Sequence, residues 1–129
     1  MKVLIVEDDF SSRIVLRSLL EPFGDVHIAV NGKEALMVNQ SESAKRVPFD
    51  LICLDIMTPE MDGQSVLKEI RRQGLEDAKS QAPKIIMTSA LSDPENILTA
   101  FREQCEGYLV KPFVKEKLFD LLRELELIG

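Results

Sequence analysis

Side chains that could do chemistry follow four of the five short apolar runs in this 129-residue chain; they are Glu7, Asp8, Asp9, Asp55, Thr88, Ser89 and Lys111. Carboxylates packed close together repel one another and raise one another's pKa values. A divalent cation removes that repulsion, and Mg²⁺ takes hard oxygen ligands of this kind. Mg²⁺ also favours phosphoryl chemistry, because it neutralises charge on the oxygens of the transferring group.

The other members of the set fit the same chemistry. A lysine ammonium supplies a point charge for one phosphoryl oxygen, and a small hydroxyl can donate a hydrogen bond to another. An aspartate beside the metal can itself be the nucleophile and form an aspartyl phosphate. The set therefore favours an acceptor aspartate over a water molecule that hydrolyses a phosphate ester.

Each of these residues also has a plainer interpretation. Asp9 stands just before Phe10, where a helix is predicted to begin, and capping that helix explains it as well as ligand binding does. A lysine before a proline usually marks a loop boundary, and a serine after a strand usually makes a turn or a cap. The placement of the whole set after four different runs is the stronger observation.

Five apolar runs alternate with helical patterns and predict the elements that position these residues. The runs span 3–6, 26–30, 51–54, 85–87 and 108–110, and several are nearly continuous, which is typical of strands covered on both faces. Apolar residues at i, i+3, i+4 and i+7 predict helices around 16–23 and 118–125. Shorter helices are predicted around 66–70 and 97–101.

Local signals agree with that alternation. Asn31–Glu34 and Ser92–Glu95 have the spacing of capping boxes, and Gly24 and Gly74 are predicted to stop the first and third helices. The polar segment 40–46 is predicted to fray or form a loop. The pattern predicts one α/β domain over residues 1–129, with a parallel sheet and right-handed crossovers. Ligands of such sheets bind at the carboxyl ends of the strands, where the reactive set lies.

Composition and charge exclude several classes of protein. The chain has 22 acidic against 16 Lys and Arg residues, a net charge of −6, which argues against direct nucleic-acid binding. No apolar run is long enough to cross a bilayer, and no secretory leader is recognisable after Met1. Cys53 and Cys105 lie in apolar patterns and His27 has no partner at metal-binding spacing. We therefore expect a reduced, cytoplasmic protein.

Four ordered blocks of this sequence carry a resemblance to a known family; they are Val6–Asp9, Leu54–Gly63, Met87–Ala90 and Gly107–Phe113. Together they resemble the receiver domain of two-component response regulators, over essentially the whole chain. The resemblance implies a doubly wound, flavodoxin-like (βα)5 fold with strand order 2-1-3-4-5. It also implies a phosphorylation switch, similar to stand-alone chemotaxis regulators, rather than an enzyme that turns over other substrates.

The resemblance also implies roles for individual residues. Asp55 resembles the phosphoacceptor, and Lys111 the lysine that pairs with the phosphoryl group. Glu7 and Asp8 resemble the acidic pair that holds Mg²⁺, with Asp8 as the direct ligand and Glu7 acting through water. Asp55 itself and the backbone carbonyl of Met57 complete the family's metal ligands.

The hydroxyl and aromatic positions of the switch follow in the same way. Counting back from Lys111 at the family's separation selects Ser89 rather than Thr88 as the switch hydroxyl. Tyr108 resembles the aromatic residue whose rotamer follows that hydroxyl, although it could simply be an amphipathic edge residue. The bond between Lys111 and Pro112 is a candidate for the cis form.

The resemblance implies partners as well. A histidine kinase or histidine phosphotransfer protein would donate the phosphoryl group, and an unknown protein target would read the switch through the helix around 97–101, the strand at 108–110 and the helix around 118–125. That face could also serve a homodimer. With no output segment after Gly129, the chain reads as a stand-alone receiver or as a fragment of a longer protein.

Two other functions compete with this interpretation. An aspartate-nucleophile phosphohydrolase would share Mg²⁺, aspartate and lysine, but it would resemble an Asp-x-Asp arrangement after the first strand. An adaptor of receiver fold that works without phosphorylation would tolerate a vestigial site, whereas here no site residue is missing.

Overall fold

The computed structural model describes residues 1–41, 46–56, 63–76, 83–90 and 105–129. Its strands are β1 (Lys2–Val6), β2 (Asp25–Ala29), β3 (Leu51–Asp55), β4 (Lys84–Ser89) and β5 (Gly107–Val110). Its helices are α1 (Phe10–Leu20), the 3-10 turn η1 (Glu21–Phe23), α2 (Gly32–Asn39), α4 (Gly63–Glu76) and α6 (Lys115–Glu124). The predicted helix around 97–101 and the capping box at 92–95 lie outside the described residues.

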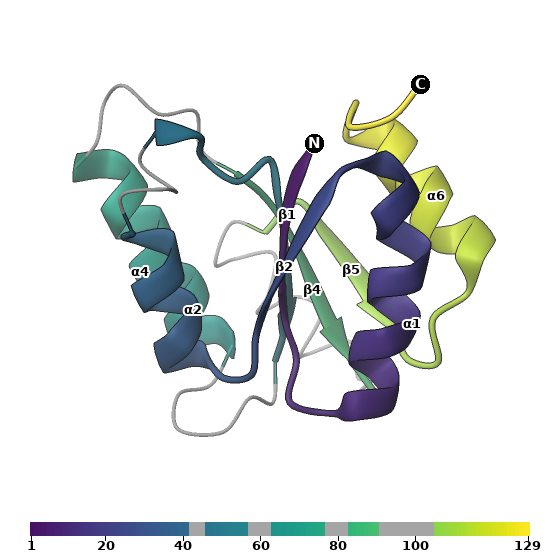
Figure 1. Cartoon of the computed structure of the whole chain (residues 1–129), viewed down its shortest axis with the longest axis horizontal. Coiled ribbons are helices and arrows are strands. Elements are labelled where there is room, and N and C mark those ends of the chain that lie inside the picture. The colour runs from purple at the N-terminus through teal and green to yellow at the C-terminus, as the bar shows by residue number, and fades with distance from the viewer. Residues whose placement is uncertain (42–45, 57–62, 77–82, 91–104) are drawn as a thin grey trace.

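The five strands form one sheet in the order β2-β1-β3-β4-β5, with every neighbouring pair parallel. The helices α1 and α6 cover one face of the sheet, and α2 and α4 cover the other (Figure 1). The predicted α/β fold and its strand order are confirmed. Because the order reverses direction between β1 and β3, the carboxyl ends of these two strands mark the topological switch point.

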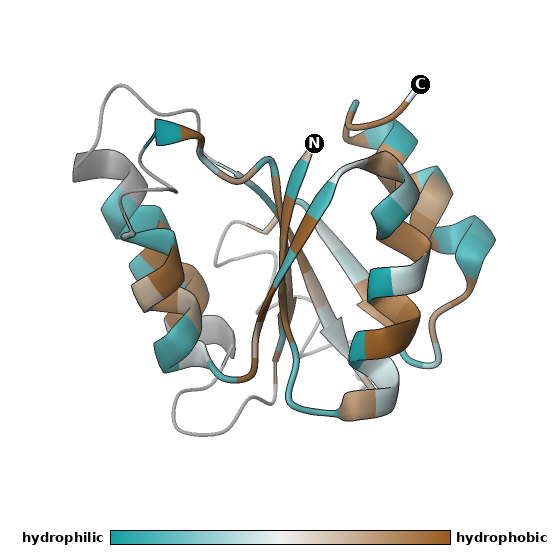
Figure 2. Ribbon diagram, viewed as in Figure 1, coloured by the Kyte–Doolittle hydropathy of each residue, from teal (hydrophilic) through white to brown (hydrophobic). Residues whose placement is uncertain are grey.

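The continuous apolar strands are explained by two cores, one on each face of the sheet. Figure 2 shows hydrophobic residues on the strands and on the helices beside them. Along β1, Leu4 and Val6 pack toward α2 and α4, whereas Val3 and Ile5 pack toward α1 and α6. Side chains alternate between faces with a period of two, so a strand covered on both sides must be apolar at every position. The apolar pattern ends at Glu7, directly after β1, and at Asp55, the last residue of β3.

Side-chain caps fix where two helices begin. The Asp9 carboxylate accepts the Ser12 N–H at 2.9 Å and caps α1, and the Asn31 side chain accepts the Glu34 N–H at 2.8 Å and caps α2. The helix α2 ends at Asn39, and Gln40 and Ser41 form a turn and a bend, so the predicted loss of helix is confirmed there, whereas Arg46 is helical.

Of the two glycine predictions, the one at Gly74 was wrong, and the one at Gly24 was correct in position. Gly74 lies inside α4, which continues to Glu76. Gly24 caps the end of η1, where its N–H donates to the Glu21 carbonyl at 3.3 Å, but its φ of 165° is extended, so the helix does not end in a left-handed turn. It is required by close approach: a Cβ there would lie 1.8 Å from the Met1 carbonyl oxygen, which accepts the Asp25 N–H.

The two cysteines are buried and free, as predicted. Burial raises the pKa of Cys53 to about 12 and, with the charge of Glu106 adding to it, that of Cys105 to about 11. Both thiols therefore stay protonated at neutral pH. No helix among the described residues is both long enough and apolar enough to span a membrane.

Candidate functional site

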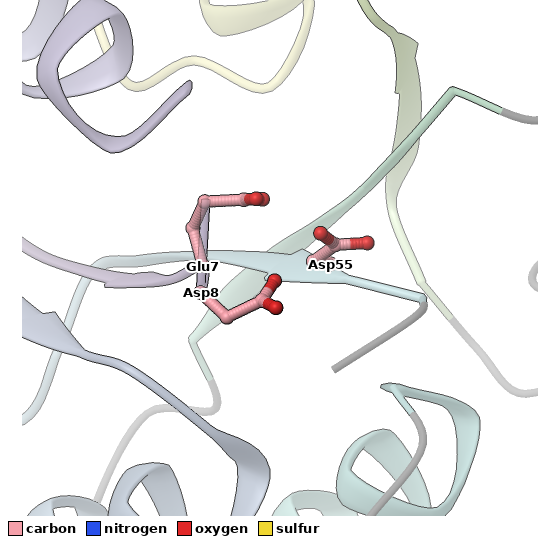
Figure 3. Close-up of side chains that lie close together, drawn as sticks. All are labelled: Glu7, Asp8 and Asp55. Atoms are coloured by element: carbon pink, nitrogen blue, oxygen red, sulfur yellow. The ribbon is translucent and has the colours of Figure 1, made fainter. Parts of the chain in front are cut away.

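Three carboxylates meet at the carboxyl edge of the sheet. Glu7 and Asp8 belong to the turn after β1, and Asp55 is the last residue of β3. One oxygen from each lies within 4.8 Å of the others, and Figure 3 shows the side chains directed into a common space. Glu7 is 0% exposed and Asp55 4% exposed, whereas Asp8 is exposed to solvent. The sheet brings these acids together because β1 and β3 are neighbours in it.

Lys111, directly after β5, supplies a cation to this acidic cluster. Its Nζ donates to Glu7 Oε1 at 2.8 Å and to Asp55 Oδ2 at 3.0 Å. The backbone N–H of Lys111 donates to the Ser89 carbonyl at 2.8 Å, which extends the β4–β5 pairing by one residue. The Lys111–Pro112 peptide bond is cis, as predicted.

The electrostatics of the cluster are dominated by burial and by carboxylate crowding. Burial, then the neighbouring carboxyl of Asp55, raises the pKa of Glu7 to about 7, although Lys111 opposes the change. Burial works to lower the pKa of Lys111, but its bonds to Glu7 and Asp55 and the charges of those carboxylates outweigh burial and raise it. The lysine therefore stays fully charged between two acids that repel each other.

The donor set fits a hard divalent cation. The Oε2 atom of Glu7 is buried and finds no hydrogen-bond partner within the part of the chain that the structure describes, which is costly for a carboxylate oxygen unless something binds beside it. The Asp8 carboxylate is exposed beside it and offers oxygen at the same place. Clustered carboxylate oxygens with access to water are the ligands that Mg²⁺ takes, with several waters retained.

The turn that carries the acids is held by several hydrogen bonds. The Glu7 N–H donates to the Ala29 carbonyl at 3.1 Å, and the Asp9 N–H donates to Glu7 Oε1 at 3.2 Å. Arg13 Nη1, from the first turn of α1, donates to the Glu7 carbonyl at 3.3 Å. Asp9 is therefore a helix cap, and its pKa is lowered mainly by its hydrogen bonds from Ser12.

Sequence reasoning did not select Arg13. The signal that could have found it is a cation in the first turn of a helix, where the positive end of the helix dipole disfavours one. Such a residue needs a partner outside the helix, and the turn immediately before α1 provides that partner.

The hydroxyl candidates lie at the end of β4. Thr88 pairs with Asp55 in the strand register and Ser89 with Val110, and both side chains are buried. Tyr108, on β5, is partly buried against the core beneath α2 and α4. It also lines a groove of about 560 Å³ between β5 and α6, which reaches Lys111. Met57 lies outside the described residues.

Comparison with known proteins places this site in a family context. A family model described as the response regulator receiver domain matches residues 3–123. The chain is 35% identical, over 96% of its length, to the probable transcriptional regulator ycf27 of Cyanophora paradoxa, of which it covers 47%. It is 37% identical, over 92% of its length, to the transcriptional regulatory protein CiaR of Streptococcus pneumoniae, of which it covers 48%. The chain thus spans about half the length of these curated relatives.

A solved structure agrees with the fold. The chemotaxis protein CheY4 of Vibrio cholerae superposes with a TM-score of 0.78 at 31% identity, covering 95% of this chain and 96% of that one.

Proposed function

The chain belongs to the family of response regulator receiver domains, and from this premise we propose that Asp55 accepts a phosphoryl group in a Mg²⁺-dependent step. The observation that carries the proposal is the acidic cluster with Lys111 at the carboxyl edge. Lys111 contacts both Glu7 and Asp55, so one cation already spans the position where phosphoryl oxygens would come to lie.

In this proposal Glu7, Asp8 and Asp55 would hold the metal ion. When bound, Mg²⁺ would supply positive charge to the oxygens of the transferring phosphoryl group. A carboxylate oxygen of Asp55 forms the new bond to phosphorus as the phosphorus–nitrogen bond of a phosphohistidine breaks. The phosphohistidine carries a proton on its other ring nitrogen, so the imidazole takes the electron pair of the broken bond and leaves as a neutral ring. The donor is a histidine kinase or a histidine phosphotransfer protein.

The chain's own residues stabilise the product. Lys111 keeps its bond to Glu7 and turns its other contact from the Asp55 carboxylate to a phosphoryl oxygen. Ser89, at the end of β4, donates its hydroxyl to a second phosphoryl oxygen and moves toward Asp55. Tyr108 then occupies the space that Ser89 leaves, which is a two-state change biased by the new contacts.

The altered state is read by another protein on the face that includes β5, α6 and the segment around 97–101. We propose that this unit makes no direct contact with nucleic acid, because its net charge is −6. It works in the cytoplasm, where protonated free thiols persist. Two copies of the chain could also associate through the same face to form a homodimer.

Acetyl phosphate tests the proposal without knowledge of the kinase. With Mg²⁺ present, the wild-type chain is expected to gain the mass of one phosphoryl group, and Asp55→Asn is expected to gain none. Asp120→Asn is the matched control, because Asp120 is an exposed aspartate paired with Arg123 on α6. Stoichiometric labelling of Asp55→Asn would overturn the assignment of the acceptor.

The same experiment separates the rival functions. Continuous release of phosphate from simple phosphate esters would support an aspartate-nucleophile phosphohydrolase. Absence of labelling, together with no change in Tyr108 fluorescence on adding Mg²⁺ and beryllium fluoride, would support an adaptor that works without phosphorylation.

A further inference from the structure

The carboxylate of Asp8 is presented by backbone rather than by neighbouring side chains. Among the described residues, no group donates a hydrogen bond to that carboxylate, although it lies within 4.8 Å of Glu7 and Asp55. Its direction therefore depends on the turn between β1 and α1. Both residues that flank Asp8 are anchored: Glu7 pairs with Ala29, and Asp9 caps α1.

Arg13 makes hydrogen bonds to both sides of that turn. Its backbone N–H donates to the Asp9 carbonyl at 3.0 Å, and its Nη1 donates to the Glu7 carbonyl at 3.3 Å. One residue thus bonds the peptide carbonyl on each side of Asp8. The first bond is an ordinary helical bond that any residue except proline would make, whereas the second requires a long side chain with a fixed donor.

The position of Arg13 is unfavourable for the helix itself. It is the fourth residue of α1, where the unpaired N–H groups and the dipole disfavour a cation. Its guanidinium also lies over the ring of Phe10, 5.6 Å from the centroid, and this ring is 65% exposed. The aromatic face restricts the guanidinium to the side of the helix from which it reaches Glu7.

We propose that Arg13 is a positioning residue for the proposed metal site: its guanidinium holds the Glu7 carbonyl so that the Asp8 carboxylate is already directed at the cation. The inference rests on the function proposed above. Without that bond the turn must be ordered when the ion binds, and the ordering weakens binding. Groups that orient metal ligands typically change metal affinity by tenfold or more when they are removed.

The simplest alternative predicts the opposite sign. Arg13 is a cation near an acidic cluster and repels Mg²⁺, so a purely electrostatic role means that neutralising it strengthens Mg²⁺ binding. A positioning role means that neutralising it weakens Mg²⁺ binding. Arg13→Met removes both the charge and the donor, and Arg13→Lys keeps the charge and one donor in a less rigid form.

The experiment is calorimetric titration of the whole chain with Mg²⁺ alone, without any phosphoryl donor. We expect about tenfold weaker binding for Arg13→Met and an intermediate loss for Arg13→Lys. Arg17→Met is the matched control, since Arg17 lies one turn further along α1 in an exposed pair with Glu21, and its Mg²⁺ affinity is expected to stay close to wild type. Circular dichroism confirms that each variant is folded.

Equal or tighter Mg²⁺ binding by Arg13→Met overturns the positioning role and leaves the proposed function standing. Failure of the wild-type chain to bind Mg²⁺ overturns both. If Arg13→Met does not fold, Arg13→Lys decides: an affinity equal to wild type contradicts the proposal, because its charge is unchanged and only the rigid donor is lost.

Discussion

The sheet has an end at which its strands begin, here called the amino edge, and an end at which they finish, the carboxyl edge. Both carry partly buried ion pairs, but the number of cations and anions in them differs. At the amino edge, Arg71 Nη2 lies 2.5 Å from Glu106 Oε1, and Arg71 Nη1 donates to the Pro83 carbonyl at 3.0 Å. The other oxygen of Glu106 accepts the Ile85 N–H at 2.5 Å. At the carboxyl edge, among the residues that the structure describes, one ammonium serves two buried or nearly buried carboxylates, and Asp8 adds a third acid beside them.

This difference in charge balance distinguishes residues that stabilise the fold from residues that destabilise it. At the amino edge one cation meets one anion, and each of them also bonds to a backbone group. At the carboxyl edge, within the described part of the chain, one ammonium serves two buried or nearly buried carboxylates, and the carboxylates of Glu7 and Asp55 repel each other. Local imbalance of this kind is characteristic of functional sites, where a ligand supplies the missing partner.

Among single substitutions, the largest expected change in stability comes from removing the ion pair at the amino edge. Glu106→Gln removes the carboxylate from Arg71 and weakens the bond to Ile85, so we expect it to lower the free energy of unfolding by about 2 kcal/mol. This is less than for a fully buried pair, because the two side chains are 16% and 26% exposed. Urea denaturation measures the change, and Asp120→Asn, which breaks an exposed pair, is expected to stay within about 0.5 kcal/mol of wild type. If Glu106→Gln were as stable as that control, the ion pair at the amino edge would not stabilise the fold, and the distinction between the two edges would be contradicted.

A change of the same kind at the carboxyl edge is expected to have the opposite sign. Asp8→Asn removes one of three crowded carboxylates, so without Mg²⁺ it should raise the free energy of unfolding by about 1 kcal/mol. Adding Mg²⁺ should stabilise the wild-type chain, by about 2.7 kcal/mol at one hundred times its dissociation constant, and should stabilise the variant far less.

Thermal denaturation with EDTA and then with Mg²⁺ measures both effects. The control is Asp25→Asn, since Asp25 is an exposed aspartate at the amino end of β2. A loss of stability in Asp8→Asn in EDTA, or the same gain from Mg²⁺ in both proteins, would contradict the proposed imbalance.

The smallest expected effect concerns the end of α6, which returns to the amino edge. Glu126 has φ 60° there, and the Leu127 N–H donates to the Leu122 carbonyl at 2.9 Å, the bond that closes a helix with a left-handed residue. Glycine adopts that conformation without strain, so Glu126→Gly is expected to raise the free energy of unfolding by about 0.5–1 kcal/mol. Chemical denaturation checks this, and a loss of stability would mean that the Glu126 side chain contributes more than its backbone strain removes.

The sequence predicted the arrangement of strands and the position of the acids well. Continuous apolar runs can be recognised from local composition alone. Parallel strands bring their carboxyl ends to one edge of the sheet whatever the exact bounds of each strand. The meeting of Glu7, Asp8, Asp55 and Lys111 follows from that topology. The caps at Asp9 and Asn31 are local hydrogen bonds and were visible for the same reason.

Features that depend on tertiary contacts were not predicted. Gly74 continues a helix because packing outweighs its low helix propensity. Gly24 is explained by the Met1 backbone, which lies far from it in the sequence. The pairing of Arg71 with Glu106 joins residues on different elements, and the bond from Arg13 to Glu7 depends on the path of one turn. Spacing alone predicts none of these contacts.

The most direct test of the central claim is to locate the phosphoryl group chemically. After incubation with acetyl phosphate and Mg²⁺, borohydride reduces an aspartyl phosphate to homoserine, which peptide mass mapping assigns to one position. We predict homoserine at position 55 alone, and none when Mg²⁺ is removed. Homoserine at any other aspartate, or a phosphorylated chain with Asp55 unmodified, would contradict the assignment of the carboxyl edge as the phosphorylation site.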